Sequence, residues 1–288
     1  MIKVSAKELL SWIQAISSKC GDKNSLYLLL DLLGGISQEE LNLLRINSSK
    51  EIYLKQSLNR LNSYWLEFIN KKRPIQYICG NTYWRDFKFK VSEDVLIPRK
   101  ETELIIDIVM GIYRHKKKVI FADLGTGSGA IAIALASLNQ TWSGLATDIS
   151  ANALNIARDN FESICKVSNL KFYCGNWWNP LDNYAGKIEV AISNPPYIPH
   201  KVYEELSMSV KKYEPEIALN GGFDGLKHIN HIIKDAPIFL KKGGWLILEN
   251  HFNQANQVVN LFKDNGFDSI EIINDYSGIG RFTIGRYK

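Results

Sequence analysis

Strand-like and helix-like segments alternate from about residue 100 to the C-terminus, and this pattern constrains the fold more than any other feature. The apolar runs KKVIFAD, GLATD, LKFYC and KIEVAIS are separated by segments of helical spacing that begin, for example, at Ala130 and Ser150. A helix from Leu226, the run GGWLILEN, another helix and the strand pair SIEIIND and GRFTIGRY complete the pattern. It predicts an α/β fold with a mostly parallel sheet and helices on both faces. Ligands of such sheets bind beyond the carboxyl ends of the strands.

Two segments precede this region. Residues 1–72 show helical spacing, as in SAKELLSWIQAI, and SQEELNLLRI contains a capping-box pattern. Residues 73–95 alternate aromatic and polar side chains, which predicts a β-hairpin connector. We therefore expect a small helical domain over 1–72, the connector over 73–95 and the α/β domain over 96–288.

The composition is that of an ordinary soluble protein, with 45% hydrophobic and 23% charged residues and a net charge of +5. So small a positive charge argues against stable nucleic-acid binding. No apolar run is long enough for a membrane span, and the first residues lack the apolar core of a signal peptide. Neither the histidines nor the four cysteines have metal-ligand spacing, and the separated cysteines indicate a reducing compartment. We expect a cytoplasmic protein without a metal; the cysteines are Cys20, Cys79, Cys165 and Cys174.

The stretch FADLGTGSGAIAIAL predicts a strand, a glycine turn and an apolar helix. Gly125, Gly127 and Gly129 permit positive φ and bring backbone N–H groups close to a ligand, and the helix N-terminus adds a partial positive charge. Asp148 ends the next strand, 19 residues after Gly129. A carboxylate at that place can accept hydrogen bonds from ribose hydroxyls. The pattern predicts a cofactor that contains a nucleoside.

Two cofactors fit this turn. Gly125, Gly127 and Ala130 loosely match the nicotinamide fingerprint G-x-G-x-x-G/A. The form D-x-G-x-G-x-G, which Asp123 leads, is similar instead to the first motif of the S-adenosylmethionine-dependent methyltransferases with a Rossmann-like sheet. A nicotinamide enzyme also needs a hydride-handling site downstream, and the segment AISNPPYIP offers none. We therefore expect S-adenosylmethionine as the methyl donor.

A tryptophan pair follows the third strand, in YCGNWWNP. Trp177 either lies against the adenine ring of the cofactor or belongs with Trp178 to the core, since tryptophan is highly buried on average. The sequence leaves both alternatives open.

In AISNPPYIP, a buried strand ends on residues that are neither acids nor bases. A turn alone would explain the prolines and the asparagine. Next to a methyl donor, the same residues suit a planar nitrogen that carries two hydrogens. The side-chain oxygen of Asn194 and the carbonyl of Pro195 can accept both hydrogens, while Pro195 and Pro196 keep the backbone rigid. Tyr197 can stack on the planar group, so orientation and electrostatic stabilisation replace a general base.

Several stretches together resemble one family. Asn194 to Tyr197 match the N-P-P-Y motif of amino-methyltransferases that act on planar nitrogens. YICGNTYW, VLIPRKETE, YEPEIALNGGFDGL, GGWLILEN and DYSGIGRFTIGRY stand in the order found in the release-factor glutamine methyltransferases, the HemK/PrmC family. The resemblance covers roughly residues 73–288, with a helical module ahead of it.

This resemblance implies methylation of the side-chain amide nitrogen (N5) of the glutamine in the Gly-Gly-Gln loop of peptide-chain release factors, a modification that supports translation termination. The helical domain would help to hold that protein partner. The cofactor would contact Asp123, Gly125, Thr126, Gly127, Ser128, Gly129, Asp148, Trp177 and Asn194. The glutamine would be held by the catalytic and substrate-binding residues Asn194, Pro195, Pro196 and Tyr197.

Two positions depart from the family pattern. Asn176 stands where the family often has an acidic residue, which weakens one expected hydrogen bond to the adenine, and Lys100 stands where proline is usual. Arg99, Glu101 and Glu103 either border the methyl-donor pocket or form a helix start with an acidic first turn. The alternative functions are an adenine N6-methyltransferase on DNA or RNA, and a non-catalytic protein that binds S-adenosylmethionine.

Overall fold

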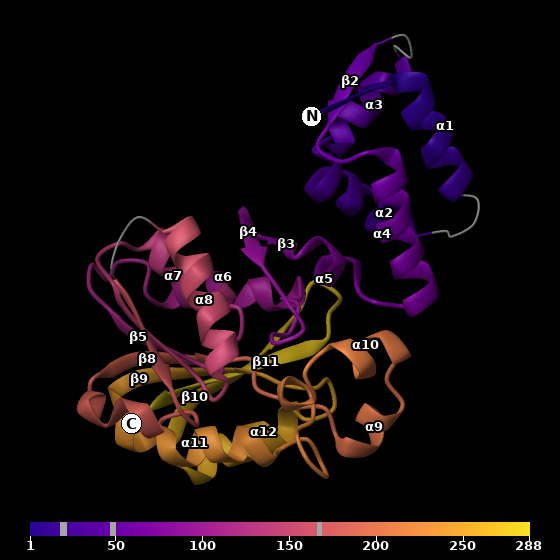
Figure 1. Cartoon of the computed structure of the whole chain (residues 1–288). Helices are drawn as coiled ribbons and strands as arrows, with labels where there is room; N and C mark the ends of the chain where they lie inside the picture. Colours follow the sequence, from indigo (N-terminus) through magenta and orange to yellow (C-terminus); the bar gives the residue numbers. More distant parts are fainter. Residues whose placement is uncertain (18–21, 47–49, 166–168) are drawn as a thin grey trace. The chain divides into compact units, whose positions relative to one another are not determined.

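The computed structural model describes residues 1–17, 22–46, 50–165 and 169–288. In this part of the chain, the strands predicted beyond residue 100 form one seven-stranded sheet of spatial order β10-β11-β9-β8-β5-β6-β7 (Figure 1). The strands are β5 (Ile120–Leu124), β6 (Ser143–Asp148), β7 (Leu170–Cys174), β8 (Ile188–Ser193), β9 (Leu240–Glu249), β10 (Phe267–Asn274) and β11 (Gly280–Tyr287). Within this sheet only β11 runs antiparallel to its neighbours, so the prediction of a mostly parallel sheet is confirmed.

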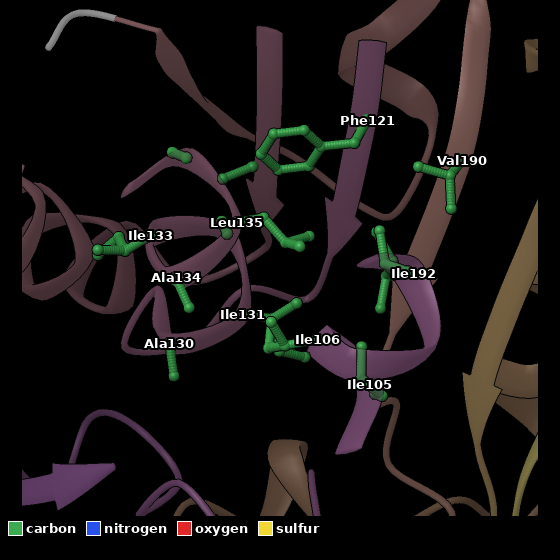
Figure 2. Packing of buried hydrophobic residues seen from close by; sticks show 14 of the residues in the cluster. Ile105, Ile106, Phe121, Ala130, Ile131, Ile133, Ala134, Leu135, Val190 and Ile192 are labelled. Carbon is green, nitrogen blue, oxygen red and sulfur yellow. The ribbon is translucent and has the colours of Figure 1, made fainter. Parts of the chain in front are cut away.

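Helices cover both faces of the sheet, as the alternation predicted (Figure 1). One face carries α6 (Leu104–Ile112), α7 (Ala130–Leu138) and α8 (Ala151–Ile164), and the other carries α11 (Lys227–Phe239) and α12 (Ala255–Asp264). Figure 2 shows the first face, where Ile106 of α6 lies beside Ile131 of α7 and Leu135 lies beside Phe121 of β5. All four side chains are buried, and removing them from water stabilises the packing of helix on sheet.

The strand order reverses at β5. From β5 the chain continues outward through β6 and β7, and then returns to the opposite side of β5 as β8. Ser193, the last residue of β8, donates a hydrogen bond from Oγ to the carbonyl of Leu124 on β5 (2.6 Å), which holds the two strand ends together. In open α/β sheets this reversal point is where ligands bind.

The described chain consists of two compact units. The first unit comprises Met1–Asn81 and Met208–Tyr213, and the second comprises Thr82–Ser207 and Glu214–Lys288 and contains the seven-stranded sheet. The helices of the first unit are α1 (Ala6–Ser17), α2 (Lys23–Leu29), continued by the π-helical turn η1 (Leu30–Gly34), α3 (Gln38–Ile46), α4 (Leu58–Lys71), α5 (Ile75–Cys79) and α10 (Met208–Tyr213).

The helices expected before residue 72 are present, and so is the capping box. Ser37 Oγ accepts a hydrogen bond from the N–H of Glu40 (3.2 Å), and the Glu40 carboxylate accepts one from the N–H of Ser37 (2.8 Å). The strands β1 (Ile2–Ser5) and β2 (Glu51–Leu54) were not predicted. They are only four residues long and pair across most of the helical region, so they leave no local periodicity to detect.

The hairpin predicted for residues 73–95 is confirmed for β3 (Asn81–Trp84) and β4 (Phe87–Lys90) and wrong for α5. Ile75, Tyr77 and Cys79 are buried in alternation, which is also the pattern of a strand, so the spacing of apolar residues did not reveal this helical turn. A proline precedes this turn, and Gly80 ends it in a left-handed conformation (φ +68°).

Short elements complete the second unit: η2 (Glu101–Glu103), η3 (Asn179–Tyr184), α9 (His200–Glu204) and η4 (Glu216–Ala218). Across the described ranges, no helix combines the length and the apolar character that a membrane span requires. Cys165 and Cys174 form no disulfide with any described residue, and Cys20 lies outside the described residues.

Candidate active site

The glycine turn after β5 is wound so tightly that its backbone requires glycine. Gly125 (φ +73°), Gly127 (φ +56°) and Gly129 (φ +84°) all have left-handed conformations. The carbonyl of Thr147 on β6 accepts hydrogen bonds from the N–H groups of Gly125 and Thr126, both at 2.9 Å. The turn therefore lies against β6 and leads into the N-terminus of α7, where backbone N–H groups favour an electronegative ligand atom.

Asp148, at the end of β6, contacts this turn. Its Oδ2 accepts a hydrogen bond from the N–H of Gly127 (2.8 Å), and its Oδ1 accepts one from the N–H of Ser150 (2.9 Å). Burial raises the pKa of Asp148, while these two donors lower it. The backbone N–H of Ile149 also lowers the pKa of Asp148, and the two carboxylate oxygens together still keep further acceptor positions. Asp148 lines the cavity and can offer those positions to a ligand.

Asp123 lies beneath the turn and does not line the cavity. Its side chain is 1% exposed, and Oδ2 accepts hydrogen bonds from the hydroxyl of Thr126 (2.6 Å) and the N–H of Ala132 (3.2 Å). Oδ1 has no hydrogen-bond partner among the described residues. Burial raises the pKa of Asp123 to about 7. The structure thus places Asp123 as a support for the turn and for α7.

The two tryptophans after β7 occupy different environments. Trp177 is half-buried, lines the cavity and has its ring against Gly125, with a left-handed backbone conformation (φ +47°). Trp178 is buried, donates from Nε1 to the carbonyl of Ile232 (3.0 Å) and stacks on Phe239 with ring centroids 5.0 Å apart. Trp178 is therefore a core residue, whereas Trp177 belongs to the wall of the cavity.

The segment from Asn194 to Tyr197 leaves the sheet at the end of β8. Asn194 Nδ2 donates a hydrogen bond to Thr102 Oγ1 (3.2 Å). Within the described ranges, no group donates a hydrogen bond to Asn194 Oδ1 or to the carbonyl of Pro195. Asn194 and Pro196 line the cavity, whereas Pro195 and Tyr197 do not. Two acceptors at one strand end are thus left without a protein donor.

Tyr197 is held at both ends. Its hydroxyl donates a hydrogen bond to Glu249 Oε1 (2.9 Å), and its backbone carbonyl accepts one from Gln254 Nε2 (2.9 Å). Burial raises the pKa of Tyr197, and the adjacent Glu249 carboxylate raises it further. The phenol is therefore protonated at neutral pH.

Sequence analysis did not identify Thr102 and Glu249 as site residues. Glu249 is 1% exposed at the end of β9, and its Oε2 accepts a hydrogen bond from the hydroxyl of Thr102 (2.7 Å). Burial raises the pKa of Glu249, while its hydrogen bonds from Thr102 and Tyr197 lower it. The glutamate before the final asparagine of GGWLILEN was the available signal, because the carboxyl ends of neighbouring parallel strands meet at one edge.

Two segments outside the sheet complete the cavity wall, one from residues 94–99 and the other from residues 215–218. Arg99 Nη2 contacts both carboxylate oxygens of Glu214, at 2.7 and 2.8 Å, and the Glu214 side chain is almost completely buried. This ion pair ties the two segments together beside the cavity.

Arg99 therefore borders the cavity, which is one of the two alternatives left open by the sequence. Glu101 and Glu103 do not line it. Glu101 is exposed, and the carboxylate of Glu103 accepts a hydrogen bond from the backbone N–H of Arg85 (2.9 Å), next to the start of α6.

The cavity combines four kinds of group: a cradle of backbone N–H groups, a carboxylate, an indole ring and, in Asn194 Oδ1, an acceptor of the amide type. The carbonyl of Pro195, a second acceptor at the same strand end, is not among the residues that line the cavity. The first three suit a nucleoside-containing ligand, and the acceptors suit a nitrogen with two hydrogens. Among the described His, Cys, Asp and Glu side chains, no group of three is placed to hold a metal ion.

Comparison with known proteins gives a consistent result. Residues 101–211 match the family model of the methyltransferase small domain. A release factor glutamine methyltransferase from Prochlorococcus marinus is 39% identical over 283 residues, which cover 96% of this chain and 96% of the relative. Relatives of the same name from Synechocystis sp. (40% identity, 82% of this chain and 81% of the relative) and Coxiella burnetii (37% identity, 82% and 83%) also match.

Among solved structures, the catalytic domain of hMettl16, in complex with MAT2A 3'UTR hairpin 6, has a TM-score of 0.56 and 15% sequence identity. The match covers 80% of each chain. At this identity the likeness concerns the fold alone, which is the Rossmann-like methyltransferase fold.

Proposed function

Since the chain belongs to the release factor glutamine methyltransferases, we propose that it transfers a methyl group from S-adenosylmethionine to the side-chain amide nitrogen (N5) of the glutamine in the Gly-Gly-Gln loop of peptide-chain release factors. It is a methyltransferase by family, with relatives at 36–40% identity that align over most of both chains. One structural observation carries the choice of an amide substrate. Asn194 Oδ1 and the Pro195 carbonyl, at the end of β8, have no hydrogen-bond donor among the described residues.

The residues around the glycine turn fit S-adenosylmethionine. The turn from Gly125 to Gly129 would hold the amino-acid part of the donor with its backbone N–H groups. Asp148 would accept hydrogen bonds from the ribose hydroxyls, and Trp177 would lie against the adenine. Asp123 would act indirectly, because it holds Thr126 and the start of α7 from below. The donor supplies a methyl group on a positively charged sulfur.

The amide nitrogen of glutamine is a poor nucleophile because its lone pair is delocalised into the carbonyl. Asn194 Oδ1 and the Pro195 carbonyl would each accept one N–H hydrogen and so orient the lone pair toward the methyl group. As the nitrogen gains positive charge, the same two acceptors stabilise it. Tyr197 would pack over the planar amide. No general base is required before transfer, since the alkylated nitrogen becomes strongly acidic.

The substrate partner in this proposal is a release factor, which the helical domain helps to hold, and the enzyme acts in the cytoplasm. The net charge of +5 gives little support for stable binding of nucleic acid.

A labelling experiment tests reaction and substrate together. The purified protein is incubated with S-adenosylmethionine that carries a labelled methyl group, and with a release factor or duplex DNA in parallel. We expect label on the release factor, and none after its Gly-Gly-Gln glutamine is replaced by alanine. Label on DNA alone would leave a methyltransferase with a different substrate. No label on either acceptor, with S-adenosylmethionine still bound, would favour the non-catalytic alternative.

Asn194→Asp tests the amide acceptor. The substitution is nearly isosteric, but a carboxylate cannot donate to Thr102 Oγ1 and would face another acceptor there. We expect turnover to fall by roughly 10² to 10³, the usual range for loss of one preorganised polar group. Retained turnover would remove Asn194 from this role. Thermal unfolding of the variant checks that the loss does not come from misfolding.

A further inference from the structure

Glu249 is the end point of a chain of side-chain hydrogen bonds that starts at Asn194. Asn194 Nδ2 donates to Thr102 Oγ1 (3.2 Å), and Thr102 Oγ1 donates to Glu249 Oε2 (2.7 Å). The other oxygen, Oε1, accepts from the hydroxyl of Tyr197 (2.9 Å). Thr102 is 5% exposed and Glu249 is 1% exposed, so water does not compete for these positions. Each residue is supplied by a different segment of the second unit: η2, β9 and the loop after β8.

The donor of each hydrogen bond in this series can be assigned. An ionised carboxylate only accepts hydrogen bonds, so Thr102 must give its single hydroxyl hydrogen to Glu249. Thr102 Oγ1 can then only accept from Asn194. The carboxamide of Asn194 must therefore turn its NH₂ group toward Thr102, which leaves Oδ1 on the other side.

The hydrogen-bond geometry of Glu249 matches the ionised form that this assignment needs, because each carboxylate oxygen faces a hydroxyl donor. Burial opposes ionisation and raises the pKa of Glu249, but the two hydroxyl donors and the Arg281 guanidinium lower it. Arg281 is itself held by Asp275, with Nε to Oδ2 at 2.9 Å. A buried carboxylate with two hydroxyl donors and a nearby cation is well satisfied.

We propose that Glu249 and Thr102 are positioning residues that fix which way the Asn194 carboxamide points, and so keep Oδ1 available to the substrate amide. This inference rests on the proposed function, because it explains how one of its two acceptors is held. We call the hydrogen-bonded side chains of Asn194, Thr102 and Glu249 the relay. Without it, the Asn194 carboxamide can rotate and present its NH₂ group, a donor, to a substrate group that also donates. Glu249 does not line the cavity, and Thr102, which does line it, acts in this proposal through Asn194 and not through contact with the substrate.

Two substitutions at Thr102 separate this role from simple packing. Thr102→Val keeps the shape and removes the hydroxyl, whereas Thr102→Ser keeps the hydroxyl and removes a methyl group. The matched control is Thr283→Val on β11. Thr283 is also fully buried, and its hydroxyl donates to a side-chain oxygen, Asn250 Oδ1, at 2.8 Å, but it has no hydrogen bond to the relay.

The primary readout is steady-state methylation of the release factor, with S-adenosylmethionine binding measured separately by calorimetry. For Thr102→Val we expect kcat to fall roughly 10- to 100-fold, somewhat less than for removal of the polar group itself. The Kd for S-adenosylmethionine should change less than about threefold, because the glycine turn and Asp148 are untouched.

Thr102→Ser should keep most of the wild-type kcat. Thr283→Val should lower the midpoint of thermal unfolding by about as much as Thr102→Val, without the loss in kcat. Equal kcat losses in Thr102→Val and Thr283→Val, or in Thr102→Val and Thr102→Ser, would overturn the proposal.

Glu249→Gln tests the acceptor end of the relay. A Gln in this place brings an NH₂ group that donates to one of the two hydroxyls, so one hydroxyl hydrogen is released from its assigned direction. We expect kcat of Glu249→Gln to fall about as far as kcat of Thr102→Val. The double variant that carries both substitutions should lose little more activity than either single variant, because both substitutions act on Asn194. Losses that multiply in the double variant would contradict a shared route.

A spectroscopic readout tests the relay even if the release factor is not the substrate. The side-chain NH₂ resonances of Asn194 are identified in ¹⁵N spectra by their loss in Asn194→Asp. Their hydrogen exchange should be protected in the wild type and in Thr283→Val, and at least about tenfold faster in Thr102→Val. Unchanged exchange in Thr102→Val would refute the relay, whereas an unlabelled release factor with the predicted exchange pattern would refute only the proposed function.

Discussion

The ring of Trp177 lies so close to Gly125 that a Cβ atom on Gly125 would stand 2.9 Å from the ring carbon Cζ3. The contact joins the glycine turn after β5 to the loop after β7, and both segments line the cavity. Trp177 adopts a left-handed backbone conformation (φ +47°) that is unusual for a large side chain. A small residue at 125 and a strained residue at 177 therefore form one wall together.

Gly125→Ala should weaken the binding of S-adenosylmethionine by displacing this ring. Gly127→Ala is the matched control, because Gly127 also has positive φ (+56°) but a Cβ there meets no atom within 4 Å. Both variants bear the backbone cost of alanine at positive φ, roughly 1 kcal/mol. We expect the Kd, measured by calorimetry, to rise at least about tenfold more in Gly125→Ala. Equal increases in the two variants would mean that the position of Trp177 does not matter for binding.

Tyr197→Phe distinguishes the ring of Tyr197 from its hydroxyl. The hydroxyl donates to the buried Glu249 and does not line the cavity, so its loss should act only through the relay to Asn194. We expect kcat to fall roughly 3- to 10-fold in Tyr197→Phe, as one of two hydrogen bonds to the carboxylate is lost. Tyr197→Ala, which also removes the ring, should fall at least tenfold further. Steady-state methylation with a saturating donor measures both, and similar losses would assign the effect to the hydroxyl alone.

Most of the architecture could be predicted from local patterns. The strands of the large sheet are short apolar runs, and the helices between them are set apart by periodicity, by the glycine turn or by a cap such as Ser150. The local pattern also predicted that the loop after β5, Asp148 and Asn194 lie at the same edge of the sheet, because the carboxyl ends of parallel strands meet there.

Long-range pairing could not be predicted in this way. Neither the sequence of β1 nor that of β2 predicts that the two strands pair. The helix α5 was predicted as part of a hairpin, because five residues are too few to show a helical period. The relay depends on Thr102 and Glu249, which are 147 residues apart and hydrogen-bonded only after folding. Threonine is common and a strand-end glutamate is not distinctive, so neither residue has a local signal for this contact.

Asn176→Asp should strengthen the binding of S-adenosylmethionine. Asn176 lines the cavity between Gly175 and Trp177, and a carboxylate there would accept a hydrogen bond from the adenine amine more strongly than an amide does. We expect the Kd to fall roughly 3- to 10-fold, as a charge-assisted bond replaces a neutral one. Asn179→Asp, at the exposed start of η3, makes the same change in charge away from the cavity and should leave the Kd within about twofold. A Kd that falls equally in both variants would indicate a general charge effect.

Asp123 should make the folded protein less stable as the pH rises toward neutrality. Burial raises its pKa from 3.8 to about 7, so between these values the folded state holds a proton that the unfolded state has lost. The free energy of unfolding therefore falls by an amount on the order of a few kcal/mol as the pH rises from about 4 to about 7. Above that range, this group makes no further change to the stability.

Asp123→Asn removes this titration while its side-chain oxygen can still accept the two hydrogen bonds from Thr126 and Ala132. In urea unfolding of the ligand-free protein, the free energy of unfolding of the wild type minus that of the variant should decrease between pH 5 and pH 8. The variant thus gains on the wild type as the pH rises, because a buried ionised carboxylate is no longer required. Parallel pH profiles for the two proteins would show that Asp123 is already ionised at pH 5 and that its unpartnered Oδ1 costs little.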